Sequence, residues 1–262
     1  MTEAGTMFSD GKVYERMMGR WSKLVGRVFL EWLNAPKNLK WIEVGCGNGA
    51  FTEELIAHCA PLEVTAVDPS EGQLSFARTR QATKLAQFRQ ADAQALPFPD
   101  RSFDAAAMAL VITFIPDPAK AVAEMARVVR PGGMIATYMW DTEAGGVPLA
   151  PLGRAFKSMG KEYARASSDA SRREVMQALW HRAGLQLVES REIRIPVTYS
   201  SFEDFCDSNL VPIGPAGQVL KAMSPAEIAE LKQRLREILP IAADGRIAYE
   251  AFANAIKGKV PG

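Results

Sequence analysis

Residues 41–49 read Trp-Ile-Glu-Val-Gly-Cys-Gly-Asn-Gly, an apolar run that ends in three alternating glycines. This pattern predicts a β-strand followed by a tight loop through Gly45, Gly47 and Gly49. Glycines let a ligand approach bare backbone, and the helix expected after the loop directs its positive N-terminal end at the same place. The next apolar run ends in Asp68, whose carboxylate can accept hydrogen bonds from both hydroxyls of a ribose. The stretch therefore predicts a nucleotide pocket at the carboxyl edge of a parallel sheet.

The same glycines also fit a competing interpretation. Gly45, Gly47 and Ala50 satisfy the G-x-G-x-x-A pattern of dinucleotide-binding proteins. However, Glu43 lies two residues before the first glycine, at the mouth of the strand, where a carboxylate offers nothing to an anionic pyrophosphate. A ligand with an ammonium group would gain from it. The residues therefore favour a cofactor with an amino-acid end and a nucleoside end, such as S-adenosylmethionine.

A third acidic residue follows the third expected strand. Residues 87–91 form a short strand pattern that ends at Asp92 and Ala93, before a turn-rich stretch. An acid at a strand tip, beside a free backbone amide, can recognise the exocyclic amine and ring nitrogen of adenine. Three strand ends thus supply three acids, Glu43, Asp68 and Asp92, for methionine, ribose and base.

Five ordered segments make the sequence resemble the class I S-adenosylmethionine-dependent methyltransferases, in the small-molecule branch that includes quinone and sterol methyltransferases. The matching segments are residues 43–49, 67–70, 91–98, 102–104 and 126–133. The likeness is specific from about residue 41 to residue 141 and looser towards the C-terminus. It implies a set of cofactor-binding residues: Glu43, Gly45, Cys46, Gly47, Gly49, Asp68, Pro69, Asp92, Ala93, Ala109 and Leu110.

The N-terminal helical stretch adds three candidates to the cofactor site. Relatives with a pattern similar to Tyr14, Arg20 and Trp21 fold this helix across the cofactor. There an aromatic ring can face the sulfonium or the acceptor, and an arginine can meet the carboxylate. The alternative is that Trp21 anchors the core and Arg20 is a solvated charge.

The resemblance also shapes the expected chemistry. A methyl group on a sulfonium sulfur is already activated, so the protein mainly has to align a nucleophile behind it and exclude water. No catalytic side chain is required. Many quinone-type relatives carry histidine or glutamate before a Pro-Asp pair, but here Thr113 and Phe114 stand in that region. The usual base is therefore missing, and Thr113, Phe114 and Trp140 are the candidates for contacts with the acceptor.

The alternating strand and helix patterns predict an α/β, doubly wound, mostly parallel sheet. The resemblance implies a Rossmann-like sheet of seven strands whose last strand is antiparallel. Strands are expected at residues 40–44, 63–67, 86–91, 105–110, 134–140, 186–199 and 245–257, and helices at 14–33, 51–58, 72–83, 118–129, 152–166 and 171–183. Residues 1–37 are expected to form an N-terminal helical cap and residues 38–262 a methyltransferase domain. The helical stretch at about 201–243 is too long for a simple connection and is interpreted as a lid, or else as a stabilising flap.

Length and composition agree with a globular protein of one α/β domain with an addition. The 262 residues carry a formal net charge of +1 and 48% hydrophobic residues, which gives no sign of a nucleic-acid-binding surface. We expect no membrane span, a cytoplasmic location, and a monomer or homodimer. The three cysteines Cys46, Cys59 and Cys206 lack the spacing of a zinc site and the even count of a disulfide framework, so no metal is expected.

Three functional hypotheses compete at this point. The favoured one is methyl transfer from S-adenosylmethionine to a small, rather apolar acceptor. The second is a protein that binds S-adenosylmethionine without transferring the methyl group, because the usual base is missing. The third is an NAD-dependent oxidoreductase, which follows only from the glycine pattern.

Overall fold

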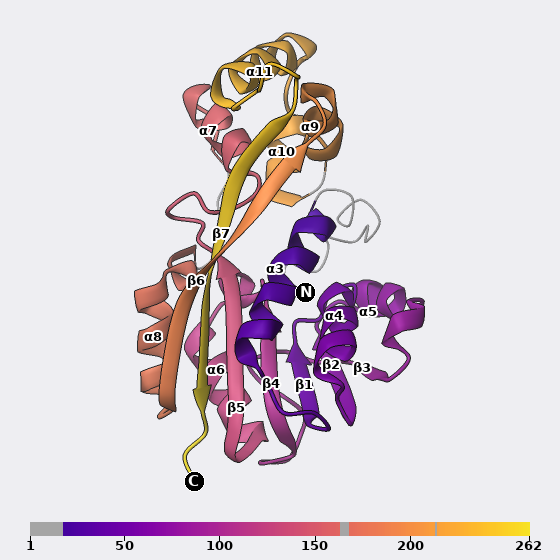
Figure 1. The fold of residues 1–262 in the computed structure, drawn as a ribbon, viewed down its shortest axis with the longest axis vertical. Coiled ribbons are helices and arrows are strands. Elements are labelled where there is room, and N and C mark those ends of the chain that lie inside the picture. Colours follow the sequence, from indigo (N-terminus) through magenta and orange to yellow (C-terminus); the bar gives the residue numbers. More distant parts are fainter. Residues whose placement is uncertain (1–17, 163–167, 213) are drawn as a thin grey trace.

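The computed structural model describes residues 18–162, 168–212 and 214–262, and its centre is one seven-stranded sheet (Figure 1). The strand order is β3-β2-β1-β4-β5-β7-β6. The strands are β1 Lys40–Val44, β2 Glu63–Asp68, β3 Ala86–Gln90, β4 Phe103–Ala109, β5 Val129–Trp140, β6 Gln186–Tyr199 and β7 Ile247–Lys259. Strand β7 runs antiparallel to both of its neighbours, β5 and β6, and the other pairs in this sheet are parallel. The predicted fold class is confirmed.

Helices cover both faces of the sheet. The α-helices of the described residues are α3 Arg20–Leu33, α4 Ala50–Cys59, α5 Glu71–Arg78, α6 Pro118–Val128, α7 Ala150–Ser158, α8 Arg173–Arg182, α9 Phe202–Asn209, α10 Gly214–Lys221 and α11 Pro225–Ile238. Short 3-10 helices lie at Gln81–Thr83, Ile112–Phe114 and Ser168–Ser171. Side chains of α3 and α4 pack on one face, and those of α6 and α8 pack on the other. This is the layered arrangement of a doubly wound fold.

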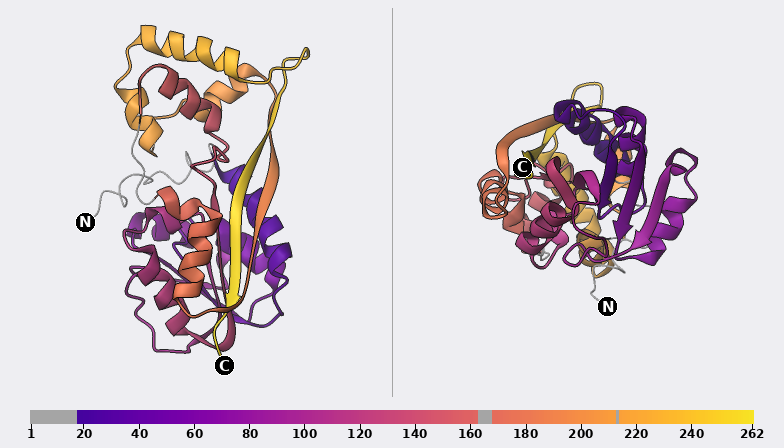
Figure 2. Two further views of the ribbon diagram at one scale, coloured as in Figure 1. Left: turned by 90° about the vertical axis from the view of Figure 1, so that its left-hand side faces the viewer. Right: turned by 90° about the horizontal axis from the view of Figure 1, so that it is seen from below.

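Helices α7, α9, α10 and α11 gather beyond the carboxyl edge of the parallel strands, and we call this group the helical head. Strands β6 and β7 extend past the rest of the sheet as a two-stranded ribbon that reaches the head (Figure 2, left). The helix expected at 152–166 is wrong over residues 159–162, because α7 ends at Ser158 and Gly160 follows in the left-handed region. Residues 163–166 lie outside the described residues. The expected helices of residues 201–243 are present as α9 to α11. The division into cap, domain and lid stays a prediction.

The start of β5 also differs from the expectation. The sequence predicts that Pro131, Gly132 and Gly133 turn the chain into a strand from Met134, but β5 already begins at Val129. Gly132 N–H donates to the Val260 carbonyl at 2.9 Å, and Val260 N–H donates to the Gly133 carbonyl at 2.9 Å. Backbone hydrogen bonds therefore continue through Gly132 and Gly133 to Val260, the residue after β7. On the other side of β5, the pairing with β4 contains a register shift.

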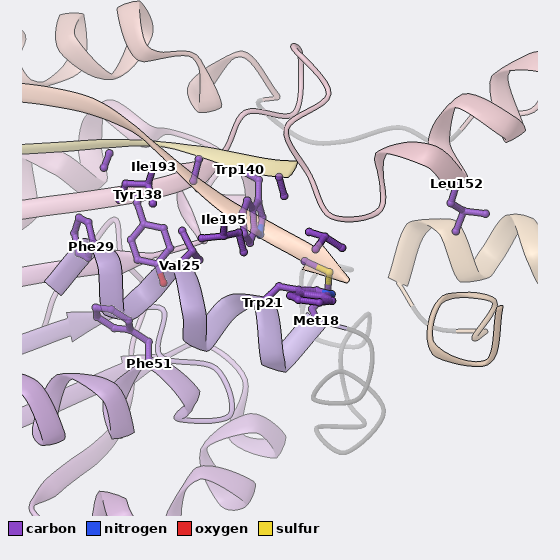
Figure 3. Close-up of a cluster of buried hydrophobic side chains, with 14 of the residues drawn as sticks. Met18, Trp21, Val25, Phe29, Phe51, Tyr138, Trp140, Leu152, Ile193 and Ile195 are labelled. Atoms are coloured by element: carbon purple, nitrogen blue, oxygen red, sulfur yellow. The ribbon is translucent and has the colours of Figure 1, made fainter. Parts of the chain in front are cut away.

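The N-terminal helix α3 is held by aromatic packing against the sheet (Figure 3). Trp21, Val25 and Phe29 are buried on one side of the helix, at the four-residue spacing that places side chains on one face. The Phe29 and Tyr138 rings lie 4.5 Å apart between centroids. Burial of each large apolar side chain stabilises the fold by about 1.5–3 kcal/mol. Helix α3 is thereby fixed across β5 and β6, with its N-terminal end near the ribbon (Figure 1).

Candidate functional site

The three positions after β1 require glycine for different structural reasons. All three lie in the left-handed region, with φ of 77° at Gly45, 50° at Gly47 and 80° at Gly49. A Cβ at Gly45 would lie 2.6 Å from the Val111 side chain, and one at Gly49 would lie 3.1 Å from the Ala77 Cβ. A Cβ at Gly47 would meet nothing within 4 Å. Gly45 and Gly49 therefore serve the packing of the chain itself, whereas Gly47 borders open space that a ligand can enter.

Hydrogen bonds fix this glycine loop to the end of β2. The amides of Gly45 and Cys46 donate to the Val67 carbonyl at 2.7 and 2.9 Å. The Gly47 amide donates to Asp68 Oδ2, and the Ser70 amide donates to Asp68 Oδ1, both at 2.9 Å. Burial raises the pKa of Asp68, although these two hydrogen bonds oppose the shift. The structure thus joins two of the predicted cofactor residues, Gly47 and Asp68, directly.

Glu43 is a buried carboxylate in which one oxygen accepts a hydrogen bond and the other has no hydrogen-bond partner among the described residues. The side chain is 1% exposed, and Thr52 Oγ1 donates to Glu43 Oε2 at 2.7 Å. Oε1 is buried and has no hydrogen-bond partner among the described residues. Burial raises the pKa of Glu43 to about 7; the Thr52 hydrogen bond opposes this shift, and the negative charge of Asp68 adds to it. A buried acceptor without a donor is costly, so this site is suited to a cationic ligand group.

The side of the loop next to α4 is braced by a charged network that the sequence analysis missed. Arg80 Nε donates to the backbone carbonyl of Asn48 at 2.6 Å, and Arg80 also pairs with Glu53 at 3.0 Å. Lys23 of α3 reaches the same Glu53 oxygen at 3.3 Å. These residues are far apart in the sequence and have no shared pattern, so only the fold reveals that α3, α4 and the glycine loop are tied together.

The third strand end lies beside the second. The Ala91 amide donates to the Asp68 carbonyl at 3.2 Å, and the Gln90 side-chain amide donates to the Pro69 carbonyl at 2.8 Å. Asp92 is exposed, and Oδ1 accepts the backbone N–H of Gln94 at 2.9 Å. Ala93 follows as a half-buried residue. The tips of β2 and β3 are therefore adjacent, as the ribose and adenine assignments require.

Residues predicted to contact the cofactor or the acceptor lie at and after the end of β4. Leu110, directly after Ala109, has a φ of 60°, and its amide donates to the Tyr138 carbonyl at 2.9 Å. Such a conformation is strained for a leucine and is typical of functional sites. Thr113 is buried and its hydroxyl contacts the Met139 sulfur at 3.7 Å, while Phe114 is 40% exposed.

Two of the three predicted residues of the N-terminal helix, Arg20 and Trp21, lie beside Tyr199 at the end of β6. Tyr14 falls outside the described residues. The guanidinium of Arg20 lies 4.2 Å from the Trp21 ring centroid and 4.6 Å from that of Tyr199. Trp21 and Trp140 are buried, and the indole N–H of each has no partner among the described residues. Contacts of Arg20 and Trp21 with a cofactor, and of Trp140 with an acceptor, stay predictions.

Cys46 lies inside the glycine loop but is poorly suited to act as a nucleophile. Its thiol is buried, and burial raises its pKa well above the ordinary value, with the negative charges of Glu43 and Asp68 adding to the shift. A protonated thiol is a weak nucleophile. The geometry therefore leaves Cys46 as a part of the loop.

The glycine loop lies in a segment of the chain that matches a known protein family. Residues 42–137 match the methyltransferase domain family. A chloroplastic 2-methyl-6-phytyl-1,4-hydroquinone methyltransferase 2 of Oryza sativa is 37% identical over 98 residues, which are 37% of this chain and 28% of that protein. A demethylmenaquinone methyltransferase of a Mycobacterium species is 36% identical over 124 residues, 47% of this chain and 48% of that protein. The chain spans less than half the length of both relatives.

Solved structures share the fold over most of the chain. The YcgJ protein of Bacillus subtilis matches with a TM-score of 0.60 and 18% identity, over 91% of this chain and 99% of that one. Phosphoethanolamine N-methyltransferase 2 of Haemonchus contortus, in complex with S-adenosyl-L-methionine, gives a TM-score of 0.60 and 16% identity, over 100% of this chain and 61% of that one. Within the described residues, no helix is both long and apolar enough to cross a membrane.

Proposed function

We propose that the chain transfers a methyl group from S-adenosylmethionine to a small, rather apolar acceptor. Residues 42–137 match the methyltransferase domain family, and quinone-type methyltransferases are among the matched relatives. The single observation that carries the proposal is the free, buried oxygen of Glu43 beside a glycine loop that Asp68 holds. The family supports S-adenosylmethionine as the cofactor and outweighs the nicotinamide hypothesis, which depended on the glycine pattern alone.

The residues at the sheet edge fit this cofactor. Glu43 Oε1 lacks a donor, which the ammonium of the methionine portion would supply. Gly47 leaves room where any side chain would project, and Asp68 keeps acceptor capacity beyond its two backbone hydrogen bonds. Asp92 stands at the adjacent strand tip for the base. Cys46, Gly45, Gly49, Pro69, Ala93, Ala109 and Leu110 complete the proposed lining.

When bound, the cofactor supplies a methyl group that is already activated on a sulfonium sulfur. The residues of the chain then have to bind and orient the cofactor and the acceptor, and to exclude water. In the proposed pocket, Glu43 binds the ammonium group of the cofactor and Asp68 binds its ribose. Thr113 carries a hydroxyl that can orient an acceptor but cannot deprotonate it at neutral pH. We therefore assign no catalytic acid or base.

Because the histidine or glutamate of many quinone-type relatives is missing, we also consider a second function, which is binding of S-adenosylmethionine without methyl transfer. The observation that favours it is the buried Thr113 in place of an ionisable residue. The names of the relatives point instead to transfer onto hydroquinones, whose hydroxyl groups ionise more readily than alcohols. An acceptor of that kind needs less help from a protein base.

Two measurements test the proposal. Titration calorimetry should show binding of S-adenosylhomocysteine and none of NAD, and NAD binding alone would revive the oxidoreductase hypothesis. Incubation with S-adenosylmethionine and a library of phenols, hydroquinones and organic acids should then release S-adenosylhomocysteine only when an acceptor is present. Tight binding without turnover on any compound would favour the second function. The cytoplasmic location and the monomer or homodimer state remain proposals, and two of the matched relatives have chloroplastic names.

A further inference from the structure

Gln94 connects the acid that follows β3 with the start of α6. Its backbone N–H donates to Asp92 Oδ1 at 2.9 Å, and its side-chain Nε2 lies 3.2 Å from Asp92 Oδ1 and 3.3 Å from Oδ2. The other atom of the same amide, Oε1, accepts the backbone N–H of Asp117 at 3.1 Å. One half-buried side chain therefore joins the residue proposed for the base to the segment that follows Thr113 and Phe114.

The two contacts require one orientation of the Gln94 amide. A glutamine amide oxygen only accepts hydrogen bonds, and its nitrogen only donates them. The Asp117 backbone N–H is a donor and must face the oxygen, whereas an ionised Asp92 carboxylate only accepts and must face the nitrogen. A glutamate in this place could still accept from Asp117 but could not donate to Asp92. The pair of contacts therefore needs an amide side chain.

The Asp117 end of this connection is fixed by α6. Asp117 is the N-cap of α6, and its Oδ1 accepts the Lys120 amide at 3.0 Å. Pro118 follows in the first turn, where its fixed φ favours the helix. The helix packs on the sheet through buried side chains such as Val122. Gln94 is therefore anchored to a packed helix.

Two further residues of α6 hold the rest of the same loop. Glu124 Oε2 accepts the Leu96 amide at 2.8 Å. Arg127 donates to the Leu96 carbonyl and to the Phe98 carbonyl, both at 2.9 Å. The Leu96 side chain is buried in the same apolar cluster as α6. The loop at residues 92–98 is therefore held along one helix, and Gln94 makes the contact that reaches a carboxylate of the proposed cofactor site.

These hydrogen bonds restrain a carboxylate that is otherwise exposed to water. The Asp92 carbonyl accepts the Ala95 amide at 3.0 Å, which fixes the backbone turn. Gln94 then supplies two donors, its backbone N–H and Nε2, to the Asp92 side chain. An ionised carboxylate has about four lone-pair sites, so acceptor capacity remains for a ligand. The contacts of Gln94 therefore set the direction in which this remaining capacity points.

We propose that Gln94 is a positioning residue for base recognition, because it orients the Asp92 carboxylate so that a remaining lone pair accepts the exocyclic amine of adenine. The inference rests on the proposed function and deepens it by assigning a residue that sets the selectivity of the cofactor site for adenine. Gln94 acts through Asp92 and is not one of the residues that touch the cofactor. The alternative role is to tether the loop to α6 without any effect on the choice of base.

The test compares two ligands on the full chain, S-adenosylhomocysteine and S-inosylhomocysteine, in which an oxygen replaces the exocyclic amine. This oxygen cannot donate to Asp92, so the wild type should bind S-adenosylhomocysteine more tightly by roughly tenfold or more. Calorimetry measures both affinities, and their ratio is the base preference. A tether that only stabilises the loop changes both affinities equally and leaves this ratio unchanged, whereas a loss of Asp92 orientation lowers the ratio.

Variants of Gln94 separate the two roles. Gln94→Glu keeps an acceptor for the Asp117 amide but removes the Nε2 donor and places a second negative charge beside Asp92. Gln94→Ala removes both contacts. Each variant should lose most of the base preference. Asp92→Ala should lose the preference as well, and the addition of Gln94→Ala to Asp92→Ala should not change it further, because the partner through which Gln94 acts is gone.

The matched control is Gln87→Ala, which removes an exposed glutamine of β3 and should keep both wild-type affinities. Thermal unfolding of each variant checks that it is folded. An unchanged base preference in either Gln94 variant, or a preference that persists in Asp92→Ala, would overturn the inference and leave the proposed function standing. If the wild type itself fails to bind S-adenosylhomocysteine, the proposed function falls and the inference falls with it.

Discussion

The Asp68 carboxylate accepts the amide hydrogen of Gly47 at 2.9 Å, so the tip of β2 holds the loop that follows β1. The other Asp68 oxygen accepts from the Ser70 amide at the same distance. One side chain therefore shapes the glycine loop and also offers its remaining lone pairs to a ribose.

Replacement of this residue should affect binding more than folding. In Asp68→Asn, the side-chain NH₂ must face one of the two backbone N–H donors, and the charge that strengthens both bonds is lost. We expect affinity for S-adenosylhomocysteine to fall by about a hundredfold, equivalent to roughly 3 kcal/mol, as measured by calorimetry. Asp100→Asn, at an exposed turn, is the control. Wild-type affinity in Asp68→Asn would contradict the ribose assignment.

Alanine substitutions at two glycines of the loop should affect protein stability and cofactor binding differently. Gly45→Ala places a Cβ 2.6 Å from the Val111 side chain at a φ of 77°, so we expect destabilisation by about 3 kcal/mol or more. Gly47→Ala meets no atom within 4 Å, so only backbone strain of roughly 1 kcal/mol remains. Urea unfolding should rank the two variants in this order. Gly47→Ala should nevertheless lose cofactor affinity, since its methyl group projects into the proposed pocket.

Arg80 should act as a positioning residue for the loop. Its side chain holds the Asn48 carbonyl at 2.6 Å and Glu53 at 3.0 Å without being part of the proposed lining. Arg80→Ala should weaken cofactor binding by roughly tenfold, and Arg80→Lys should restore little because a lysine cannot make both contacts at once. Arg78→Ala, which removes an exposed ion pair with Glu71, should leave binding unchanged. Equal effects of Arg80→Ala and Arg78→Ala on affinity would contradict this role.

The raised pKa of Glu43 predicts that the protein without cofactor becomes less stable as the pH rises. Glu43 has a pKa of about 7 in the folded chain and an ordinary, lower value when unfolded. The unfolded state therefore loses its proton first as the pH rises, and stability falls between about pH 4.5 and pH 7 and then stays low. For a shift of this size the penalty is roughly 3 kcal/mol. Asp68 has a raised pKa and contributes with the same sign.

Glu43→Gln isolates this effect because it keeps the size of the side chain and removes its titration. Thermal unfolding without cofactor, from pH 4.5 to pH 8, should show a gain in stability for the variant over the wild type that grows with pH. A difference between the two proteins that does not change with pH would show that folding does not raise the pKa of Glu43.

The sequence predicts the α/β body well because its signals are local. The strand at Lys40–Val44 is predicted by an apolar run, and the loop after it is predicted by the glycines that end this run. The order of the strands in the sheet is known only from the structure. The helical head is harder to predict, because α7 joins α9 to α11 through contacts between segments distant in the chain. The role of Arg80 cannot be predicted from the sequence for the same reason, because its contacts with Asn48 and Glu53 join residues far apart in the chain.

Glu43 offers the most direct test of the central claim, that a buried carboxylate at the strand end binds the amino-acid part of the cofactor. Calorimetry should compare S-adenosylhomocysteine with 5′-methylthioadenosine, which lacks that part, on wild type and Glu43→Gln at pH 8. We predict that the wild type prefers S-adenosylhomocysteine by roughly a hundredfold, as expected for a charged hydrogen-bonded contact of about 3 kcal/mol, and that Glu43→Gln loses most of this preference while binding methylthioadenosine as before. An undiminished preference in Glu43→Gln would contradict the account.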